Sequence, residues 1–270
     1  MAALTPTRVR RLEALATERA ARRGEYLGRY RADPARLMVD AGLAPDPWQE
    51  RLLRADAPRA LLLCARQTGK STATAFLALK AALLEPGTTV LVISQSLSQS
   101  SELLRKVTGR LDRLGRPAGV AATSATKLEL GNGSRVLSLP GSEATIRGFS
   151  AGLLIVDEAA RVQDALLAGV RPMLAATGGR FVALSTAFAR RGWFHALWTG
   201  GGAGWLKLSV TARDCPRISP DFLAEEERVL GRRWFAMEYL NEFQDDVAAV
   251  FGAGDVRAAL TSAVTPLFVE

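Results

Sequence analysis

Gly69, Lys70 and Ser71 stand in a row at the end of a short polar loop, and residues 61–63 before this loop are all leucine. An apolar strand, a glycine-containing loop and a helix in this order direct backbone N–H groups and a helix N-terminus at one point, where an anion binds. In such a loop Lys70 reaches the β- and γ-phosphates of a nucleotide, and the Ser71 hydroxyl is a ligand of Mg²⁺. The nucleotide-binding residues predicted from this stretch are Gln67, Thr68, Gly69, Lys70, Ser71 and Thr72.

The match to the usual phosphate-binding loop is incomplete. The usual pattern has a glycine five residues before Gly69, and this chain has Cys64 there. An ordinary turn before the alanine-rich segment 73–80 is the alternative interpretation. The choice depends on whether the rest of the chain supplies the other groups of a nucleotide site.

Two adjacent carboxylates, Asp157 and Glu158, follow the apolar run 153–156. Such a run is typical of a strand buried on both faces in a parallel sheet. Asp157 would share the Mg²⁺ with Ser71, and Glu158 would polarise a water towards the γ-phosphate. The alternative is a strand that merely ends in an acidic turn. Together with Lys70, the pair favours hydrolysis of a nucleoside triphosphate.

Further polar groups fall where a nucleotide site would use them. Gln49 opens a predicted helix, and its amide donor and acceptor suit the edge of an adenine, whereas a solvated helix residue is the alternative. Arg147 precedes a glycine shortly before the acidic strand. It is a candidate arginine finger, a group worth roughly 10³ to 10⁵ in rate. Ser185 and Thr186 end another apolar run, where they would sense the γ-phosphate.

A predicted helix over residues 97–114 has a basic second half. The net charge of the chain is +8 and its pI is near 10.2, which favours a polyanion as partner. Most of this positive charge is arginine, which coding bias also explains. A solvated helix face is the alternative to a surface that binds a phosphate backbone. The candidate DNA-binding residues, with one from the hairpin that follows, are Arg105, Lys106, Arg110, Arg113 and Arg135.

The bulk properties exclude several classes of protein. The chain has 270 residues, 48% of them hydrophobic and 23% charged, as in a globular protein with a full core. No apolar run approaches the roughly 20 residues of a membrane span, so no membrane partner is expected. Two cysteines make neither a disulfide framework nor a zinc cluster. The single histidine, His195, stands among aromatic residues, where packing is its expected role.

The pattern along the chain predicts an α/β fold in three parts. Residues 1–45 form a helical arm and connector, 46–215 the ATPase core, and 216–270 a helical lid with a C-terminal linker. The strands and helices predicted in the core and lid are strands at 88–94, 181–187 and 205–210, a hairpin at 127–139, and helices at 97–114, 222–227 and 233–243.

The order and spacing of these motifs resemble the ATPase domain of the large terminase subunit of tailed bacteriophages. The resemblance covers roughly residues 45–250, and the segments that carry it are Ala65–Ser71, Ile146–Gly148, Leu153–Ala160, Leu184–Ala187 and Glu238–Phe243. Terminases commonly have a divergent phosphate-binding loop with an arginine where Arg66 stands. The absence of a glycine at Cys64 therefore agrees with the resemblance.

The resemblance implies a P-loop NTPase of the ASCE, RecA-like type, with a mostly parallel sheet flanked by helices and a small helical lid. It implies a motor that uses ATP and Mg²⁺ to move double-stranded DNA into a procapsid. The motor would act in the host cytoplasm as a homo-oligomeric ring on a portal protein, with a small terminase subunit as partner.

The same resemblance assigns roles to individual residues. Glu158 corresponds to the catalytic base, Gln49 to the adenine-contacting glutamine, and Arg66 and Arg147 are both candidates to contact the γ-phosphate. We favour Arg147 as the finger donated to the next subunit, because Arg66 lies inside its own loop. The motif that couples hydrolysis to movement corresponds to Ser185, Thr186 and Ala187.

Family members usually continue into a nuclease domain, and this chain stops at Glu270, about where that domain would begin. We therefore expect no nuclease activity from these residues, the domain being either removed or encoded elsewhere. Two alternatives to the packaging motor remain. One is a helicase-like nucleic-acid ATPase, although 270 residues leave no room for a second RecA-like domain. The other is a module that binds nucleotide or DNA without turnover.

Overall fold

The computed structural model describes residues 24–140, 148–201 and 204–245, together with residues 11, 14, 18 and 259. Residues 24–32 are helical. The helices that follow are α2 (Arg36–Asp40), α3 (Pro47–Arg54), α4 (Lys70–Leu84), α5 (Leu97–Arg113), α7 (Asp164–Val170), α8 (Pro172–Ala175), α9 (Gly192–Gly200) and α10 (Pro220–Tyr239), with short 3-10 helices η1 (Ala159–Arg161) and η2 (Ala212–Asp214). The strands are β1 (Arg59–Cys64), β2 (Thr89–Ser94), β3 (Val120–Thr123), β4 (Lys127–Leu130), β5 (Arg135–Pro140), β6 (Leu153–Asp157), β7 (Arg180–Ser185) and β8 (Trp205–Val210).

These strands form one sheet in the order β3-β4-β5-β2-β6-β7-β1-β8. The strands from β5 to β8 in that order are all parallel, and β3 and β4 pair antiparallel at one edge. The acidic strand β6 is separated from β1 by one strand, β7. This inserted strand is the feature of the ASCE type that the sequence predicted, so the predicted fold class is confirmed.

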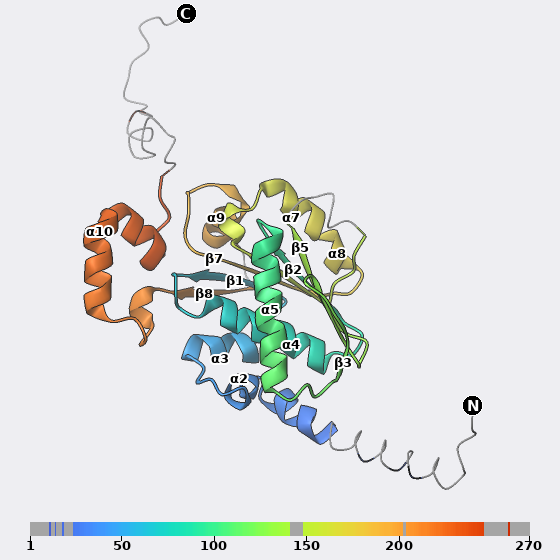
Figure 1. The fold of residues 1–270 in the computed structure, drawn as a ribbon. Helices are drawn as coiled ribbons and strands as arrows, with labels where there is room; N and C mark the ends of the chain where they lie inside the picture. The colour runs from blue at the N-terminus through green and yellow to red at the C-terminus, as the bar shows by residue number, and fades with distance from the viewer. Residues whose placement is uncertain are drawn as a thin grey trace, which may run out of the picture.

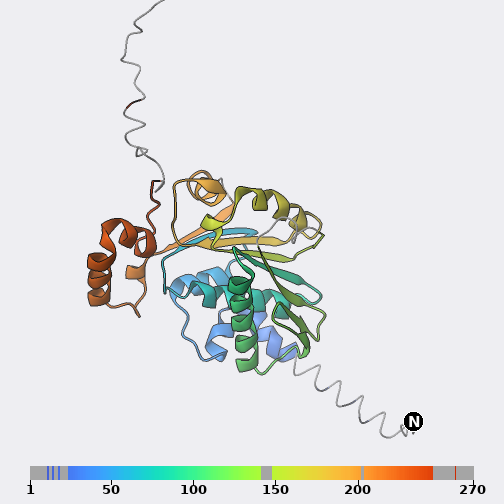
Figure 2. The same cartoon turned by 45° about the horizontal axis from the view of Figure 1, so that its top comes forward.

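Helices cover both faces of the sheet (Figures 1 and 2). Successive side chains of a strand point to opposite faces. Ala60 and Leu62 of β1 therefore pack in the core that contains α2 to α5, while Leu61 and Leu63 pack with α7 to α9. Burial on both faces explains why these parallel strands are apolar without alternation.

Most of the predicted elements are present close to their expected bounds. The hairpin of β4 and β5, the strands β2, β7 and β8, and the helix α5 all follow the apolar pattern. The Ser96 side chain accepts a hydrogen bond from the Gln99 N–H and so caps α5. Within the described residues, no helix is both long and apolar enough to cross a membrane.

Other elements differ from the prediction. The final helix ends at Tyr239 and does not reach residue 243, and Gly231, with φ 75°, kinks it in the middle. The strand β3 and the helices α7, α8 and α9 had no predicted counterpart, because each is short and its apolar residues depend on contacts with the sheet. His195 packs edge-on against Phe243, with ring centroids 4.7 Å apart, which confirms its expected role.

Candidate nucleotide-binding site

The loop between β1 and α4 bends tightly at the carboxyl-terminal edge of the sheet. Gln67 and Gly69 have positive φ angles of 62° and 90°, a conformation that glycine adopts without strain. The Thr68 hydroxyl donates to the Ala65 carbonyl at 2.9 Å, so this buried side chain closes the loop on itself. Since α4 begins at Lys70, its first backbone N–H groups have no partner within the helix and are available to an anion.

Lys70 and the two carboxylates after β6 meet in front of this loop. The Lys70 Nζ lies 2.5 Å from Glu158 Oε1 and 3.8 Å from Asp157 Oδ1. Glu158 has left-handed backbone angles, φ 52° and ψ 41°, and its N–H donates to Asp157 Oδ1 at 3.0 Å. Burial raises the pKa of the Asp157 carboxyl, and the nearby Lys70 ammonium opposes this rise. The structure thus joins residues that are far apart in the sequence into one charged cluster.

A second layer of charges lies behind Glu158. Arg161 Nε is 3.8 Å from Glu158 Oε2, and Arg161 Nη2 is 3.5 Å from Glu238 Oε1. The buried Glu238, only 7% exposed, also accepts from Arg66 Nε at 2.7 Å. In addition the Arg66 N–H donates to the Glu238 carbonyl at 3.0 Å. The charges therefore alternate in sign from Lys70 to Arg66, and the chain of contacts ends on helix α10.

Sequence analysis assigned no role to Arg161 or Glu238. Arg161 lies one short 3-10 turn after Glu158, so its closeness to the acidic pair was a readable signal. Glu238 belongs to a motif that supports the family resemblance, but its sequence position is distant from the loop. Only the return of α10 to the edge of the sheet brings it there.

These residues surround a cleft of about 640 Å³. Its walls are mostly polar and include Lys106 of α5, Glu158 and Thr186 besides the loop itself. The predicted nucleotide-binding residues that line it are Arg66, Gln67, Gly69, Lys70, Ser71 and Thr72. A polar cleft of this size, with a helix N-terminus at its base, fits a polyphosphate.

Gln49 lies beside the loop and is 3% exposed, so it is not the solvated residue of the alternative interpretation. Its Oε1 accepts from the Asp46 N–H at 2.9 Å, and its Nε2 donates to the Gly69 carbonyl at 3.4 Å. Asp46 in turn binds Arg217 through two contacts of 2.8 and 2.7 Å, and Arg217 also donates to the Thr68 carbonyl at 3.4 Å. The amide is thus engaged at both ends, and contact with an adenine would require it to exchange a partner.

The segment after β7 lies on the other side of the loop. Ser185 is fully buried and its hydroxyl has no hydrogen-bond partner among the described residues. Thr186 lines the cleft and Ala187 is buried behind it. Nearby, Asn241 donates to the Leu63 carbonyl of β1 at 2.9 Å. The end of β7 therefore touches the cleft, and the residues that follow α10 are fixed to the strand that precedes the loop.

The candidate DNA-binding residues do not form one patch. Lys106 lines the nucleotide cleft, and Arg105 pairs with Glu102 on its own helix. Arg135 starts β5 and donates to Thr89 at the start of β2, on the sheet edge away from the cleft. Because α5 runs back along the sheet from the end of β2, Arg113 also lies towards that far edge, one helical turn beyond Arg110. Arg147 lies outside the described residues.

The oxygen donors at the site suit Mg²⁺, which is usually held by one or two protein ligands and the phosphates of its substrate. Ser71 on the first turn of α4 supplies a hydroxyl, and Asp157 at the end of β6 supplies a carboxylate. Among the described residues no cluster of three or more His, Cys, Asp or Glu side chains surrounds a metal-sized space. The donor set therefore fits a metal that arrives with a nucleotide better than a permanently held one.

Loop, sheet order and acidic strand together define a P-loop NTPase fold. The family model for the terminase large subunit, T4likevirus-type, N-terminal, matches residues 61–256, and the chain belongs to this family. The terminase large subunit of Escherichia phage T5 is 26% identical over 228 residues, which cover 79% of this chain and 51% of that protein. The chain thus spans about half the length of this curated relative.

Solved structures show the same fold. The large terminase ATPase domain of Thermus phage P74-26 has a TM-score of 0.68 at 21% identity, covering 77% of this chain and 96% of that domain. The large terminase of another thermophilic bacteriophage, in complex with ADP, has a TM-score of 0.61 at 13% identity, covering 70% of this chain and 49% of that one. These likenesses, with the family match, confirm the resemblance and the fold predicted from the sequence.

Proposed function

We propose that this chain is the ATP-hydrolysing motor domain that moves double-stranded viral DNA into a procapsid. The observation that carries the proposal is the contact of Lys70 with Glu158 and Asp157 in front of the phosphate-binding loop, in a chain of the terminase family. The ADP complex of the thermophilic bacteriophage terminase supports a nucleotide as the ligand of the cleft.

In the proposed reaction Lys70 changes partner. The γ-phosphate of ATP draws its ammonium away from Glu158, and the backbone N–H groups at the start of α4 bind the phosphate chain. Glu158, released from Lys70, then orients a water for in-line attack and accepts its proton. Ser71 and Asp157 would hold Mg²⁺, which neutralises charge on the phosphates.

Two arginines are available to complete the site. Arg66 lines the cleft but is bound to Glu238, so it would have to leave that carboxylate to reach a phosphate. We assign the trans-acting finger to Arg147, supplied by the neighbouring subunit. Gln49 would read the adenine by giving up one of its two present hydrogen bonds.

Movement would begin at Ser185, Thr186 and Ala187, which couple loss of the γ-phosphate to the lid. Residues 216–270 act as the lid and linker, 46–215 as the core, and 1–45 as a helical arm. The contacts of Glu238 and Asn241 with the loop and with β1 give a direct path from the nucleotide to α10. The motor acts in the host cytoplasm as a ring on a portal protein, with a small terminase subunit. The basic residues of α5 would face DNA, and no nuclease activity is expected of these residues.

The test is steady-state ATP hydrolysis against protein concentration, for wild type, Glu158→Gln and Arg147→Ala, with and without double-stranded DNA. A general base contributes about 10²- to 10⁴-fold, so Glu158→Gln should lose at least that much turnover. A rate per subunit that rises with concentration in wild type, and not in Arg147→Ala, supports the trans finger.

Other outcomes would change the proposal. A Glu158-dependent rate that stays flat with concentration keeps the ATPase and removes the trans finger. Equal stimulation by single- and double-stranded DNA points to the helicase-like alternative. No turnover under any of these conditions, with nucleotide still bound, points to a binding module.

A further inference from the structure

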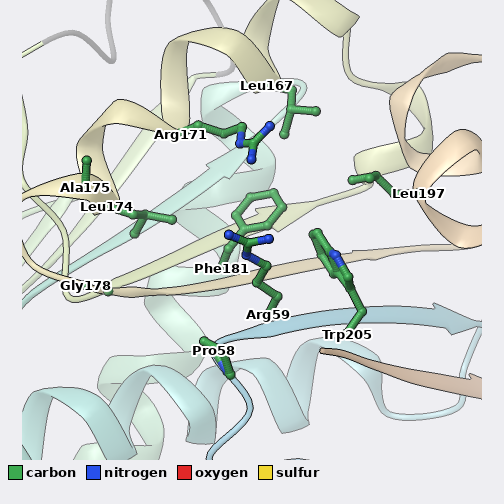
Figure 3. Close-up of a pocket in the computed structure, with 11 residues that line it drawn as sticks. Pro58, Arg59, Leu167, Arg171, Leu174, Ala175, Gly178, Phe181, Leu197 and Trp205 are labelled. Carbon is green, nitrogen blue, oxygen red and sulfur yellow. The ribbon is translucent and has the colours of Figure 1, made fainter. Parts of the chain in front are cut away.

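A second cavity, of about 460 Å³, lies at the opposite edge of the sheet, where β7, β1 and β8 begin. Figure 3 shows its floor, made by the rings of Phe181 and Trp205, whose centroids are 6.0 Å apart at an interplanar angle of 83°. Leu167 and Leu174 form the wall on the side of α7 and α8. The cavity therefore offers an apolar and aromatic surface that does not belong to the nucleotide site.

Two guanidinium groups stand beside this floor. Arg59 lies over the Trp205 ring, 5.8 Å from its centroid, and Arg171 reaches towards Phe181 from the end of α7 (Figure 3). Neither has an ion-pair partner within the described part of the chain, and no lining residue is acidic. A partner for this cavity must therefore present an apolar side chain next to a negative charge.

The same chain carries such a surface on α10. Phe222 and Val229 of this helix are 44% and 72% exposed, and Glu225 is exposed between them. Residues three, four and seven apart share one face of a helix, so these side chains form a single stripe of two apolar groups and a carboxylate. Among the described residues Glu225 has no ion-pair partner, which leaves its charge available.

The two surfaces lie far apart on one molecule. In both ribbon views α10 stands at one side of the sheet, and α8, beside the cavity, stands at the other (Figures 1 and 2). The stripe of one copy therefore has to meet the cavity of another copy. Since the two contacting surfaces are different, the contact is head-to-tail, and it closes into a ring or continues as a filament.

We propose that the Phe222–Val229 stripe of α10 docks into the Arg59–Arg171 cavity of a second copy. Phe222 or Val229 enters above Phe181, and Glu225 pairs with the two guanidinium groups. This inference deepens the proposed ring motor and rests on it, because it names the surfaces by which neighbouring subunits join. It places the lid of one subunit on the core of the next.

Cross-linking between two different variants tests the docking directly. One protein carries Phe222→Cys and the other Ala175→Cys, at the exposed rim of the cavity. Both native cysteines, Cys64 and Cys215, are buried, so the introduced thiols are the reactive ones. A short bis-maleimide should link the two variants when they are mixed, and should link neither variant to itself. The matched control replaces Ala175→Cys with Val39→Cys, an exposed position on α2, and should give no such product.

A charge exchange provides the second measurement. Arg171→Glu and Glu225→Arg should each weaken self-association by at least about tenfold in sedimentation velocity, and the double variant should recover it. ATP turnover at low protein concentration is measured in parallel. Loss of association with unchanged basal turnover separates a failure of docking from a failure of the proposed ATPase.

The proposal is overturned by any of three results. These are a chain that stays monomeric at every concentration, a cross-link yield equal to that of the Val39→Cys control, or a double charge variant that associates no better than the single ones. Association that survives both single charge changes would assign the ring contact to other surfaces.

Discussion

The two edges of the sheet hold their charges in opposite ways. At the carboxyl-terminal edge every charged side chain of the cluster from Lys70 to Arg66 touches a group of opposite sign. At the amino-terminal edge Arg59 and Arg171 lie against aromatic rings without an acidic partner in the described residues. The first edge must break contacts to accept a ligand, whereas the second has charges ready for one.

This difference has an energetic consequence. A ligand of the nucleotide cleft must compensate for the ion pairs that it disrupts, since a buried charge that loses its partner costs several kcal/mol. Such a site binds only a ligand that brings equivalent charge, as a triphosphate does. The open guanidinium groups at the other edge are solvated and cost little to leave unpaired, so they suit a reversible protein contact.

The largest expected effect is that of Lys70→Ala on nucleotide affinity. Loss of a charged donor to the phosphates should weaken binding about 10- to 100-fold, because such hydrogen bonds contribute roughly 1.5–3 kcal/mol. Titration with a fluorescent ATP analogue measures this. Arg171→Ala, which removes a cation at the other edge, is the control and should bind as wild type does; equal losses in both would erase the proposed contrast.

Glu238→Gln should destabilise the fold, since this buried carboxylate accepts from both Arg66 and Arg161. We expect a loss of about 1–3 kcal/mol in the free energy of unfolding, measured by urea denaturation. Glu102→Gln is the matched control, because it breaks an exposed pair with Arg105 and should cost less than about 1 kcal/mol. A cost for Glu238→Gln no greater than that of the control would mean that the charged network does not hold α10.

Gly69→Ala should also cost about 1–2 kcal/mol, because residue 69 has a left-handed backbone. A Cβ there would lie 2.7 Å from the Gln49 Nε2, whereas one at Gly87, with φ 77°, would meet nothing within 4 Å. Gly87→Ala therefore reports the backbone strain alone. Thermal unfolding of both, and of Gly69→Ala with Gln49→Ala, separates strain from the clash; the double variant should regain the difference between the two single ones.

The smallest effect is expected at the other edge. Arg59→Ala and Arg171→Ala should each change the free energy of unfolding by less than about 0.5 kcal/mol, because neither guanidinium has an ion-pair partner to lose among the described residues. Urea denaturation at low protein concentration, where subunits are separate, is the measurement. A loss above about 1 kcal/mol, the typical cost of a destabilising substitution, would show that these cations support their own subunit.

Much of the nucleotide site was predictable because its signals are local. The apolar run before the loop, the Gly69–Ser71 segment and the acidic pair after residues 153–156 each indicate their own conformation. Their meeting also follows from a general rule, since parallel strands end at the same edge of a sheet. Arg161 and Glu238 were missed because an ion pair between them requires α10 to return to the loop, and no local pattern records this.

The sequence by itself determined the fold class, the family resemblance and the phosphate-binding loop, because periodicity, turn chemistry and motif order are properties of neighbouring residues. Only the tertiary structure decided that Lys70 is held by Glu158, that Gln49 is engaged at both ends of its amide, and that Arg59 and Arg171 share one cavity. Those arrangements join residues up to 172 positions apart, as in the Arg66–Glu238 pair. Their distances are set by how the helices pack on the two faces of the sheet, which no short stretch of the chain specifies.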